Sequence, residues 1–442
     1  MKALLYPTYM KRRSSEVEAA LEQLDRDHLR RERRTIEGFV EPGSRVATIV
    51  DGRQLIDFSS NDYLGLARHP AVAAAMSECA ARCGSGSGAS HLVTGHGAEH
   101  TRLEEELAAF TGRERALLFS TGYMANLAVI ATLAERGESV LLDRLSHASL
   151  IDGALLSGAR FKRYAHADVA AAESALAANG ENVAVVATDG VFSMDGDLGP
   201  LDALARASRA QDAWLVVDDA HGLGVIGATG RGTVEHFGLS ADAVPVLVGT
   251  LGKAFGSFGA FVAGSRDLIE LLMQKARSYI YTTALPQPVA AASRKALEIA
   301  QRETWRRERV LALTARFHEG AEQMGVALMG AGADLRATAR TATGALAHAG
   351  SGASAQAGLR AGATALPLTP IQPVLVGTAD AALRAQRTLF TAGFCVVAIR
   401  PPTVPSGSAR LRVTLSASHT EDQVDGLIEA LSRAYASDDI VC

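Results

Sequence analysis

Lys253 lies alone between glycines at the end of an apolar run, a setting that suits chemistry on an amine. The run Val244–Val248 is long enough for a buried strand and leads into Gly249-Thr250. Glycines on both sides of Lys253 let the backbone approach a bound group closely. A lysine placed there is either a phosphate-binding cation or an amine nucleophile.

The phosphate-loop motif does not account for this lysine. That motif requires a glycine six residues before the lysine and a Ser or Thr directly after it. Those two positions hold Leu247 and Ala254. The spacing therefore favours an amine nucleophile.

The elements around Lys253 predict an α/β fold. From Glu99 to about Val262, helical and strand-like patterns alternate, which indicates crossover units and a mostly parallel sheet covered on both faces. In such sheets ligands bind at the carboxyl ends of the strands. Polar clusters follow five of the expected strands, and we expect one active site where they meet. The clusters are Thr121-Gly122-Tyr123, His147, Ser193, Asp218 with His221, and Thr250 with Lys253.

Length, charge and cysteine content set the broad class. A chain of 442 residues is long enough for two or three domains, and its net charge of −4 predicts no electrostatic attraction to nucleic acid or to an anionic membrane. No apolar run approaches the ~20 residues needed to span a bilayer, and the N-terminal residues do not form a convincing signal peptide. The four cysteines lack zinc-site spacing, so we expect reduced thiols in a cytoplasmic protein. They are Cys79, Cys83, Cys395 and Cys442.

We expect three regions along the chain. Residues 1–58 form an N-terminal arm, with an amphipathic helix over about Ser14–Glu37 and a hairpin that turns at Asp51-Gly52. Residues 59–290 form the large domain. Residues 291–442 form a smaller α+β domain, interrupted near residues 331–365 by an Ala/Gly-rich tract whose composition favours a mobile insertion.

The glycine-rich segment Gly84–Gly97 is expected to be a loop with backbone amides free for a ligand. His96 and His100 share a helix face at the i, i+4 spacing of metal ligands. A carboxylate or a third histidine in register is not evident in the sequence, so we expect no metal site.

A dinucleotide-binding fingerprint also occurs. Gly222, Gly224 and Gly227 match its spacing and follow a strand. However, Asp218 and Asp219 precede the match, where their charge would oppose a pyrophosphate, and no clean amphipathic helix follows. A nicotinamide oxidoreductase is therefore the weaker alternative.

A pyridine cofactor held as a lysine Schiff base explains more of the residues. Lys253 supplies the amine, and Asp218 at a strand end can keep the ring nitrogen protonated. Phosphate binding falls to Thr250, to Ser193 and to the amides of Gly122-Tyr123 at a helix N-terminus. His147 or Tyr123 can stack on the ring.

Six stretches carry a family resemblance: FSSNDYLGL (Phe58–Leu66), FSTGYMAN (Phe119–Asn126), DRLSHASL (Asp143–Leu150), DGVFSMDGD (Asp189–Asp197), VDDAHGLGVIG (Val217–Gly227) and GTLGKAFG (Gly249–Gly256). They resemble the α-oxoamine synthases, pyridoxal-phosphate enzymes of the aspartate-aminotransferase-like fold type I. These enzymes join an amino acid to an acyl thioester and release carbon dioxide. The resemblance extends from about Leu29 to Leu431 and implies a large domain with a mostly parallel sheet and a smaller α+β C-terminal domain.

The resemblance implies a role for each site residue. Lys253 would bind pyridoxal 5′-phosphate covalently, and Asp218 would pair with its ring nitrogen. His147 and Ala220 would lie against the two ring faces, and His221 would reach the phenolic oxygen. The remaining cofactor contacts would come from Gly122, Tyr123, Ser193 and Thr250.

The resemblance also implies the substrates. Segment Ala398–Ala417 is most similar to family members that condense L-alanine with a pimeloyl thioester of coenzyme A or of a carrier protein; glycine-using relatives are the alternative. Arg31 and Thr403 match substrate-contacting positions, with Arg30 as the alternative within the arginine run. The family's sites lie at a homodimer interface, where Thr282 or Thr283 would reach the neighbouring subunit's phosphate.

Overall fold

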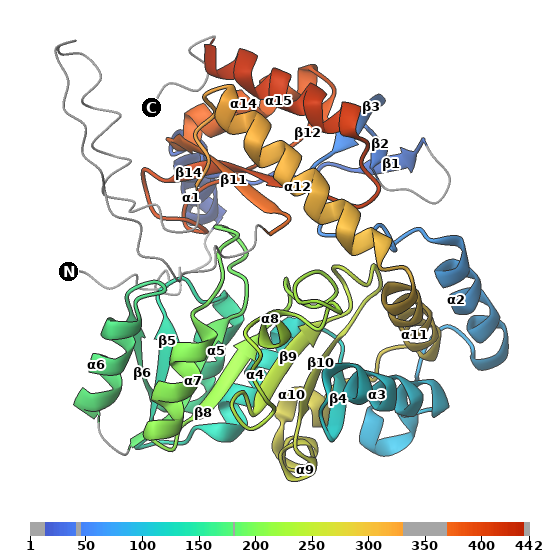
Figure 1. Ribbon diagram of the computed structural model, residues 1–442, viewed down its shortest axis with the longest axis vertical. Helices are drawn as coiled ribbons and strands as arrows, with labels where there is room; N and C mark the ends of the chain where they lie inside the picture. The colour runs from blue at the N-terminus through green and yellow to red at the C-terminus, as the bar shows by residue number, and fades with distance from the viewer. Residues whose placement is uncertain (1–13, 41–45, 180–181, 330–368, 437–442) are drawn as a thin grey trace.

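The computed structural model describes residues 14–40, 46–179, 182–329 and 369–436. The Ala/Gly-rich tract and Cys442 lie outside these ranges. Figure 1 shows two parts, a large sheet with its helices below and a smaller sheet with its helices above. The helix α12 (Trp305–Gln323) runs between the two parts.

A seven-stranded sheet organises the large part, in the order β4-β10-β9-β8-β7-β5-β6. Strand β10 is antiparallel to both of its neighbours, and the pairs β9-β8, β8-β7, β7-β5 and β5-β6 are parallel. The predicted mostly parallel sheet is therefore confirmed. The strands are β4 Arg115–Phe119, β5 Ser139–Asp143, β6 Arg160–Tyr164, β7 Val183–Asp189, β8 Trp214–Asp218, β9 Val246–Thr250 and β10 Ala260–Gly264.

Helices cover both faces of this sheet. Successive strand residues point to opposite sides, so each strand contributes apolar side chains to both faces, and helices bury them. Val216 packs in a core cluster with residues of α4, α5 and α9, whereas its neighbour Val217 packs in another with residues of α6 and α7. The helices of this part are α2 Pro70–Cys83, α3 Ala98–Thr111, α4 Gly122–Leu133, α5 Ala148–Ser157, α6 Val169–Asn179, α7 Leu201–Ala210, α8 Thr233–His236, α9 Arg266–Lys275, α10 Arg277–Ile280 and α11 Gln287–Arg302.

The N-terminal arm differs partly from its prediction. Helix α1 (Ser14–Arg26) is shorter than predicted and ends well before Glu37. Just after the helix, His28 takes a left-handed backbone conformation with φ of 55°, and strand β1 (Ile36–Phe39) follows further along the chain. The predicted hairpin is confirmed: β2 (Ala47–Val50) and β3 (Arg53–Asp57) are antiparallel, and Asp51 and Gly52 between them have φ of 50° and 70°. Two positive φ values in a two-residue loop define the type I′ turn.

The arm and the C-terminal region share a sheet. Strand β12 (Phe394–Cys395) pairs in parallel with β3, which gives the order β1-β2-β3-β12. A second sheet has the order β11-β14-β13. The three-region division of the chain stays a prediction. The remaining elements are β11 Ile371–Gly377, α14 Ala379–Thr391, β13 Val397–Ile399, β14 Ala409–Thr414 and α15 Glu421–Ala436.

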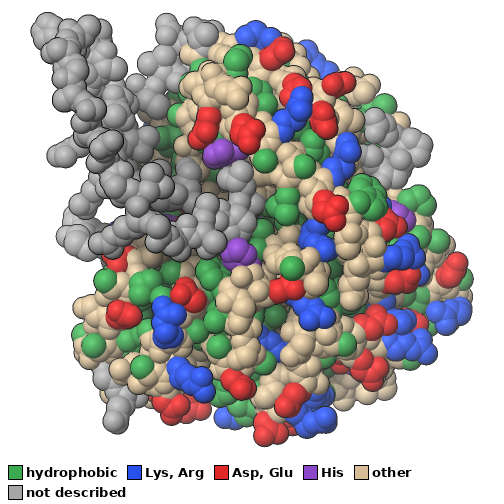
Figure 2. Space-filling view, viewed as in Figure 1, with side chains coloured by type: hydrophobic (Ala, Val, Ile, Leu, Met, Phe, Trp, Pro, Cys, Tyr) green, Lys and Arg blue, Asp and Glu red, His purple; other side chains and the backbone are tan. Residues whose placement is uncertain are grey.

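Charged side chains are interspersed on the molecular surface. On the face in Figure 2, blue basic and red acidic side chains alternate over the part of the chain that the structure describes. None of the described helices has the length and hydropathy needed to cross a membrane.

Candidate functional site

Lys253 begins a polar chain at the carboxyl edge of the large sheet. It follows β9, and its Nζ lies 2.7 Å from Nε2 of His221. Burial lowers the pKa of Lys253 to about 8, against the opposing effect of the Asp218 carboxylate. Burial also lowers the pKa of His221 well below its usual value, so this ring is neutral and its Nε2 accepts a hydrogen bond from Lys253 Nζ. The Lys253 amine is therefore easier to deprotonate than a surface lysine.

The chain of polar groups continues to an arginine. His221 Nδ1 lies 2.7 Å from the hydroxyl of Tyr63, which donates to Asn61 Oδ1 at 3.1 Å. Asn61 Oδ1 also accepts from Arg412 Nη1 at 3.0 Å. Lys253 and Arg412 are thus the two cationic ends of one buried hydrogen-bonded chain.

Arg412, on β14, was not predicted as a site residue. Its Nε donates to the Ser193 carbonyl at 2.6 Å, whereas its buried Nη2 has no hydrogen-bond partner among the described residues. A buried guanidinium N–H without a partner is costly unless a ligand satisfies it. The signal in the sequence was two arginines, Arg410 and Arg412, which alternate with apolar residues in β14, a strand that is buried along its whole length.

Asp218 ends β8 and is held by two donors. Asn126 Nδ2 donates to Asp218 Oδ2 at 2.6 Å, and the Ala220 backbone N–H donates to Oδ1 at 3.1 Å. Asn126, in α4, also donates to Ser149 Oγ at 2.8 Å. These bonds fix the direction of the carboxylate. Sequence reasoning missed Asn126, which reaches Asp218 only through the packing of α4 on the sheet.

His147 caps the N-terminus of α5. Its backbone N–H donates to Asp189 Oδ2 at 3.0 Å, and its Nδ1 lies 2.7 Å from Ser149 Oγ. Burial lowers the pKa of His147, the Asp218 carboxylate raises it and the Lys253 cation lowers it. The Tyr123 ring lies edge-on to the His147 ring, with centroids 6.5 Å apart. A neutral imidazole thus lies within electrostatic range of both Lys253 and Asp218.

The start of α4 at this edge suits a phosphate. Helix α4 opens at Gly122-Tyr123 after the cap residue Thr121, whose side chain accepts from Met124 N at 3.2 Å. The first amides of a helix have no intrahelical partner and attract anions. Thr250 Oγ1 donates to the Gly259 carbonyl at 3.1 Å and accepts from Gly252 N at 3.3 Å.

The donor set fits pyridoxal phosphate. The cofactor needs an amine, a carboxylate for its ring nitrogen and donors for its phosphate. Lys253 has a depressed pKa, Asp218 is held with its oxygens accepting, and α4 presents free amides beside the ring of His147. The predicted cofactor residues therefore gather at one edge of the sheet.

The other predicted residues contact different partners. Arg31 Nη2 donates to Thr403 Oγ1 at 3.2 Å, so these two contact each other, whereas Arg30 pairs with Asp25 at 2.7 Å. Thr283 forms an isolated β-bridge with Ser90. Within the described residues, no recorded contact links these side chains to Lys253, and their substrate and partner roles stay predictions.

The glycine fingerprint does not form a dinucleotide site. Gly222–Gly227 forms turns, and the next helix, α8, has only four residues. The Thr233 backbone N–H at the start of α8 is already taken by Asp219 Oδ2 at 2.7 Å. A pyrophosphate would find neither a long helix N-terminus nor free amides at that position.

His166 holds the loop that carries Ser193. Its Nδ1 lies 3.0 Å from Asp143 Oδ1 and its Nε2 lies 2.8 Å from Asp197 Oδ2. Burial opposes the charge on His166, but the hydrogen bonds to these two carboxylates prevail and raise the pKa of His166 to about 10. Both ring nitrogens therefore donate, and the cation ties β5 to the loop after β7.

Replacing His166 with Gln is expected to lower the free energy of unfolding at pH 7 by about 2–4 kcal/mol, because two charge-assisted hydrogen bonds are lost. His166 has a pKa of about 6.5 in the unfolded chain and about 10 in the folded protein. Its contribution to the free energy of unfolding is therefore complete below about pH 6.5 and is lost as the pH rises through about 10. Urea unfolding from pH 6 to pH 10 should thus show a steeper fall for the unaltered protein than for His166→Gln. The exposed His236→Gln serves as control, and equal slopes for the unaltered protein and His166→Gln would contradict this role.

Comparison with known proteins agrees with the geometry. The family model of class I and II aminotransferases matches residues 53–431. A relative from Methylococcus capsulatus, named 8-amino-7-oxononanoate synthase, is 55% identical over 396 residues, which are 90% of this chain and 93% of the relative. One of the same name from Thioalkalivibrio sulfidiphilus is 53% identical over 429 residues, 96% of this chain and 99% of the relative.

Two solved structures are also similar. A serine palmitoyltransferase from S. paucimobilis superposes with a TM-score of 0.82 at 28% identity, covering 96% of this chain and 97% of its own. An 8-amino-7-oxononanoate synthase from Francisella tularensis superposes with a TM-score of 0.70 at 30% identity, covering 87% of this chain and 98% of its own.

Proposed function

The chain belongs to the class I and II aminotransferase family and within it to the α-oxoamine synthases, and we propose that it condenses L-alanine with a pimeloyl thioester to give 8-amino-7-oxononanoate. It is a pyridoxal-phosphate-dependent acyltransferase. The observation that carries the proposal is the buried chain from the Lys253 amine to the unsatisfied Arg412 N–H, beside the Asp218 carboxylate. The names of the relatives supply the product.

We assign the cofactor contacts from this arrangement. Asp218 would pair with the ring nitrogen, and His147 and Ala220 would lie against the two ring faces. Lys253 would hold the cofactor covalently, and His221, which contacts Lys253, would reach the cofactor's phenolic oxygen. Ser193, Thr250 and the amides of Gly122-Tyr123 would bind the phosphate. When bound, pyridoxal phosphate withdraws electrons from the amino-acid Cα and so stabilises negative charge there.

The protein's own groups move the proton. The free amine of Lys253, with a pKa of about 8, is partly neutral near pH 7 and acts as the base for the alanine Cα proton. His221 stays neutral and accepts from Lys253 Nζ, which fixes the direction of that amine. Asp218 is held in one orientation by its two donors, Asn126 Nδ2 and the Ala220 backbone N–H.

The reaction balances with these groups. One carbon–carbon bond forms between alanine Cα and the thioester carbonyl carbon, and the carrier leaves as a thiolate that takes up one proton from solvent to become the thiol. The alanine carboxylate then leaves as carbon dioxide, and a proton returns to Cα from Lys253. Arg412 lies where its free Nη2 can hold the alanine carboxylate before it leaves.

We propose that the active protein is a homodimer with shared sites. Large apolar side chains are exposed on both segments that meet at the Ser90–Thr283 bridge: Val93 is 73% exposed and Tyr281 is 72% exposed. Exposed apolar groups of this size favour a protein partner. In the dimer, Thr282 or Thr283 would reach the partner's cofactor phosphate.

The proposal places the enzyme in the cytoplasm. Cys79, Cys83 and Cys395 are free thiols, and cytoplasmic reductants keep such thiols reduced.

The amino-acid preference separates this function from its nearest alternative, a sister enzyme that uses glycine. The visible absorption band of the cofactor-loaded protein is expected to shift on adding L-alanine, at a half-saturating concentration about tenfold below that of glycine. A single buried methyl group supports a preference of roughly this size. Titration of both amino acids, with Lys253→Ala as control, measures it. A preference for glycine would transfer the proposal to the sister activity.

A further inference from the structure

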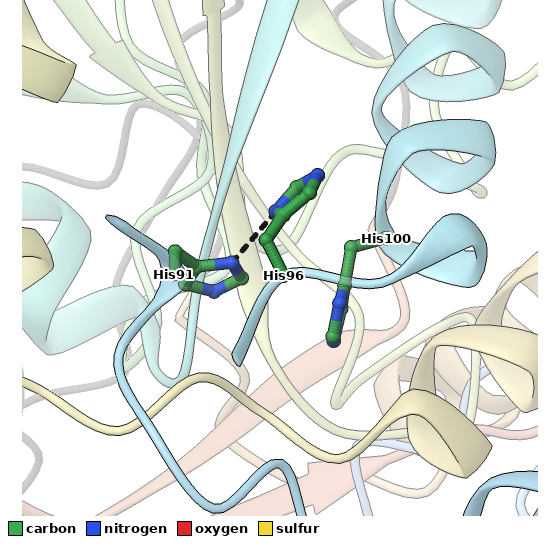
Figure 3. Close-up of side chains that lie close together, drawn as sticks. All are labelled: His91, His96 and His100. Atoms are coloured by element: carbon green, nitrogen blue, oxygen red, sulfur yellow. Dashed lines mark hydrogen bonds between the residues drawn. The ribbon is translucent and has the colours of Figure 1, made fainter. Parts of the chain in front are cut away.

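Three histidines gather beside the segment that ends at Leu285. His91 opens the short π-helix η1 (His91–Gly95), His96 follows it, and His100 lies in the first turn of α3. Figure 3 shows the three rings together. One ligand nitrogen from each ring lies within 4.8 Å of the others. Sequence spacing paired only His96 with His100, found no third histidine in register and predicted a loop here. The structure corrects this expectation, because His91 joins the other two histidines.

The π-turn is what brings His91 into the group. The Gly95 N–H donates to the Ser90 carbonyl at 2.9 Å, which closes the turn. A Cβ at Gly95 would lie 2.0 Å from the Ala89 carbonyl oxygen, so only glycine fits there. A sequence-spacing rule built on the 3.6-residue helix does not find a ligand placed in this way.

Outer hydrogen bonds orient two of the rings. His100 Nε2 lies 2.7 Å from the Leu285 carbonyl, an acceptor, so Nε2 carries the proton and Nδ1 carries the lone pair. His96 Nε2 lies 3.0 Å from Thr101 Oγ1, which can accept the Nε2 proton in the same way. A carbonyl or hydroxyl partner on the far nitrogen is the usual outer support of a metal-binding histidine. The Gly97 N–H donates a hydrogen bond to His100 Nδ1 at 2.9 Å, and an ion bound at Nδ1 would displace this hydrogen bond.

In the His91–His96 contact one Nδ1 carries a proton that it donates to the other, and a metal ion can take the place of that proton. The two Nδ1 atoms are 2.9 Å apart, and two facing lone pairs at that distance repel unless a proton or a metal ion lies between them. Two metal–nitrogen bonds of about 2.0–2.1 Å at a tetrahedral angle would place the two nitrogens about 3.3 Å apart, so a small shift of the rings would admit an ion. Neutral imidazole is the form of histidine that binds metal ions.

We propose that His91, His96 and His100 bind one divalent transition-metal ion of the zinc class through their Nδ1 atoms. Imidazole nitrogens suit such ions, and three of them leave one position of a tetrahedron for water. The ion replaces the proton shared by His91 and His96, and that proton moves to His91 Nε2, so no net proton is released. The site is structural: His100 bonds the Leu285 carbonyl, and the ion would thereby tie η1 and α3 to that segment.

Calorimetric titration of Zn²⁺ into chelator-treated, cofactor-loaded protein tests this site. One ion per chain is expected, with a micromolar or lower dissociation constant, and His96→Gln should weaken binding at least tenfold. His96 is partly exposed, so its variant is expected to fold, which circular dichroism checks. His236→Gln, which removes an exposed histidine on α8, should bind as the unaltered protein does. No binding, or equal binding by the unaltered protein and His96→Gln, would overturn the proposal.

X-ray absorption at the zinc edge gives a readout that does not depend on any variant. A histidine site shows only ligands at about 2.0–2.1 Å, whereas a cysteine site shows sulfur at about 2.3 Å. A sulfur shell would assign the ion to the thiols of Cys79 and Cys83 on α2 and would overturn the histidine site.

Discussion

Lys253→Ala is expected to lose at least about 10²–10⁴-fold in kcat while keeping its fold. The variant lacks both the group that holds the cofactor covalently and the base for the Cα proton, and loss of a general base alone costs about that much. The side chain's recorded hydrogen bond is to His221, so little structure depends on it. The measurement is the rate of thiol release from pimeloyl-coenzyme A with saturating L-alanine, alongside thermal unfolding.

Lys275→Ala is the matched control for this change. Lys275, in the last turn of α9, is exposed and makes only a long ion pair of 3.9 Å with Glu135. Its removal should leave kcat unchanged. Near-normal turnover by Lys253→Ala would remove Lys253 from the mechanism.

Arg412→Lys is expected to raise the KM for L-alanine about 10–100-fold and to change the KM for the pimeloyl thioester little. Lysine keeps the positive charge but lacks the planar fork that binds Ser193, Asn61 and a carboxylate together. A hydrogen bond to a charged group is worth roughly 1.5–3 kcal/mol, which sets the size of the effect. Steady-state kinetics with each substrate varied in turn measures the two constants.

The neighbouring Arg410 supplies the control for Arg412. Its guanidinium is occupied by the Ser408 carbonyl and by an ion pair with Asp195. Arg410→Lys should therefore reduce stability and leave the KM for L-alanine close to normal. If both variants raised that KM equally, Arg412 would have no specific carboxylate role.

Local patterns in the sequence were enough to predict a mostly parallel sheet, although they did not mark β6 and β10 as strands. Strands such as β8 and β9, buried on both faces, are continuous apolar runs. Thr121 caps α4, whose N-terminus the sequence placed at Gly122-Tyr123. These features depend on residues adjacent in the chain, so spacing alone reveals them.

Features that depend on distant packing were not predictable in this way. Arg412 reaches Asn61 across 351 positions of sequence, and Asn126 reaches Asp218 across 92. The pairing of β12 with β3 likewise joins the two ends of the chain. Such contacts leave no periodic signal in the sequence, because the residues next to one partner carry no information about the position of the other.

Carbon dioxide release from L-alanine labelled with ¹³C at the carboxyl carbon tests the central claim most directly. With pimeloyl-coenzyme A, or the same acyl group on a carrier protein, the enzyme is expected to release one labelled carbon dioxide and one thiol for each 8-amino-7-oxononanoate formed. Without the thioester, labelled carbon dioxide should stay at background. Thiol release without labelled carbon dioxide, or turnover with glycine but not with L-alanine, would contradict the proposed reaction.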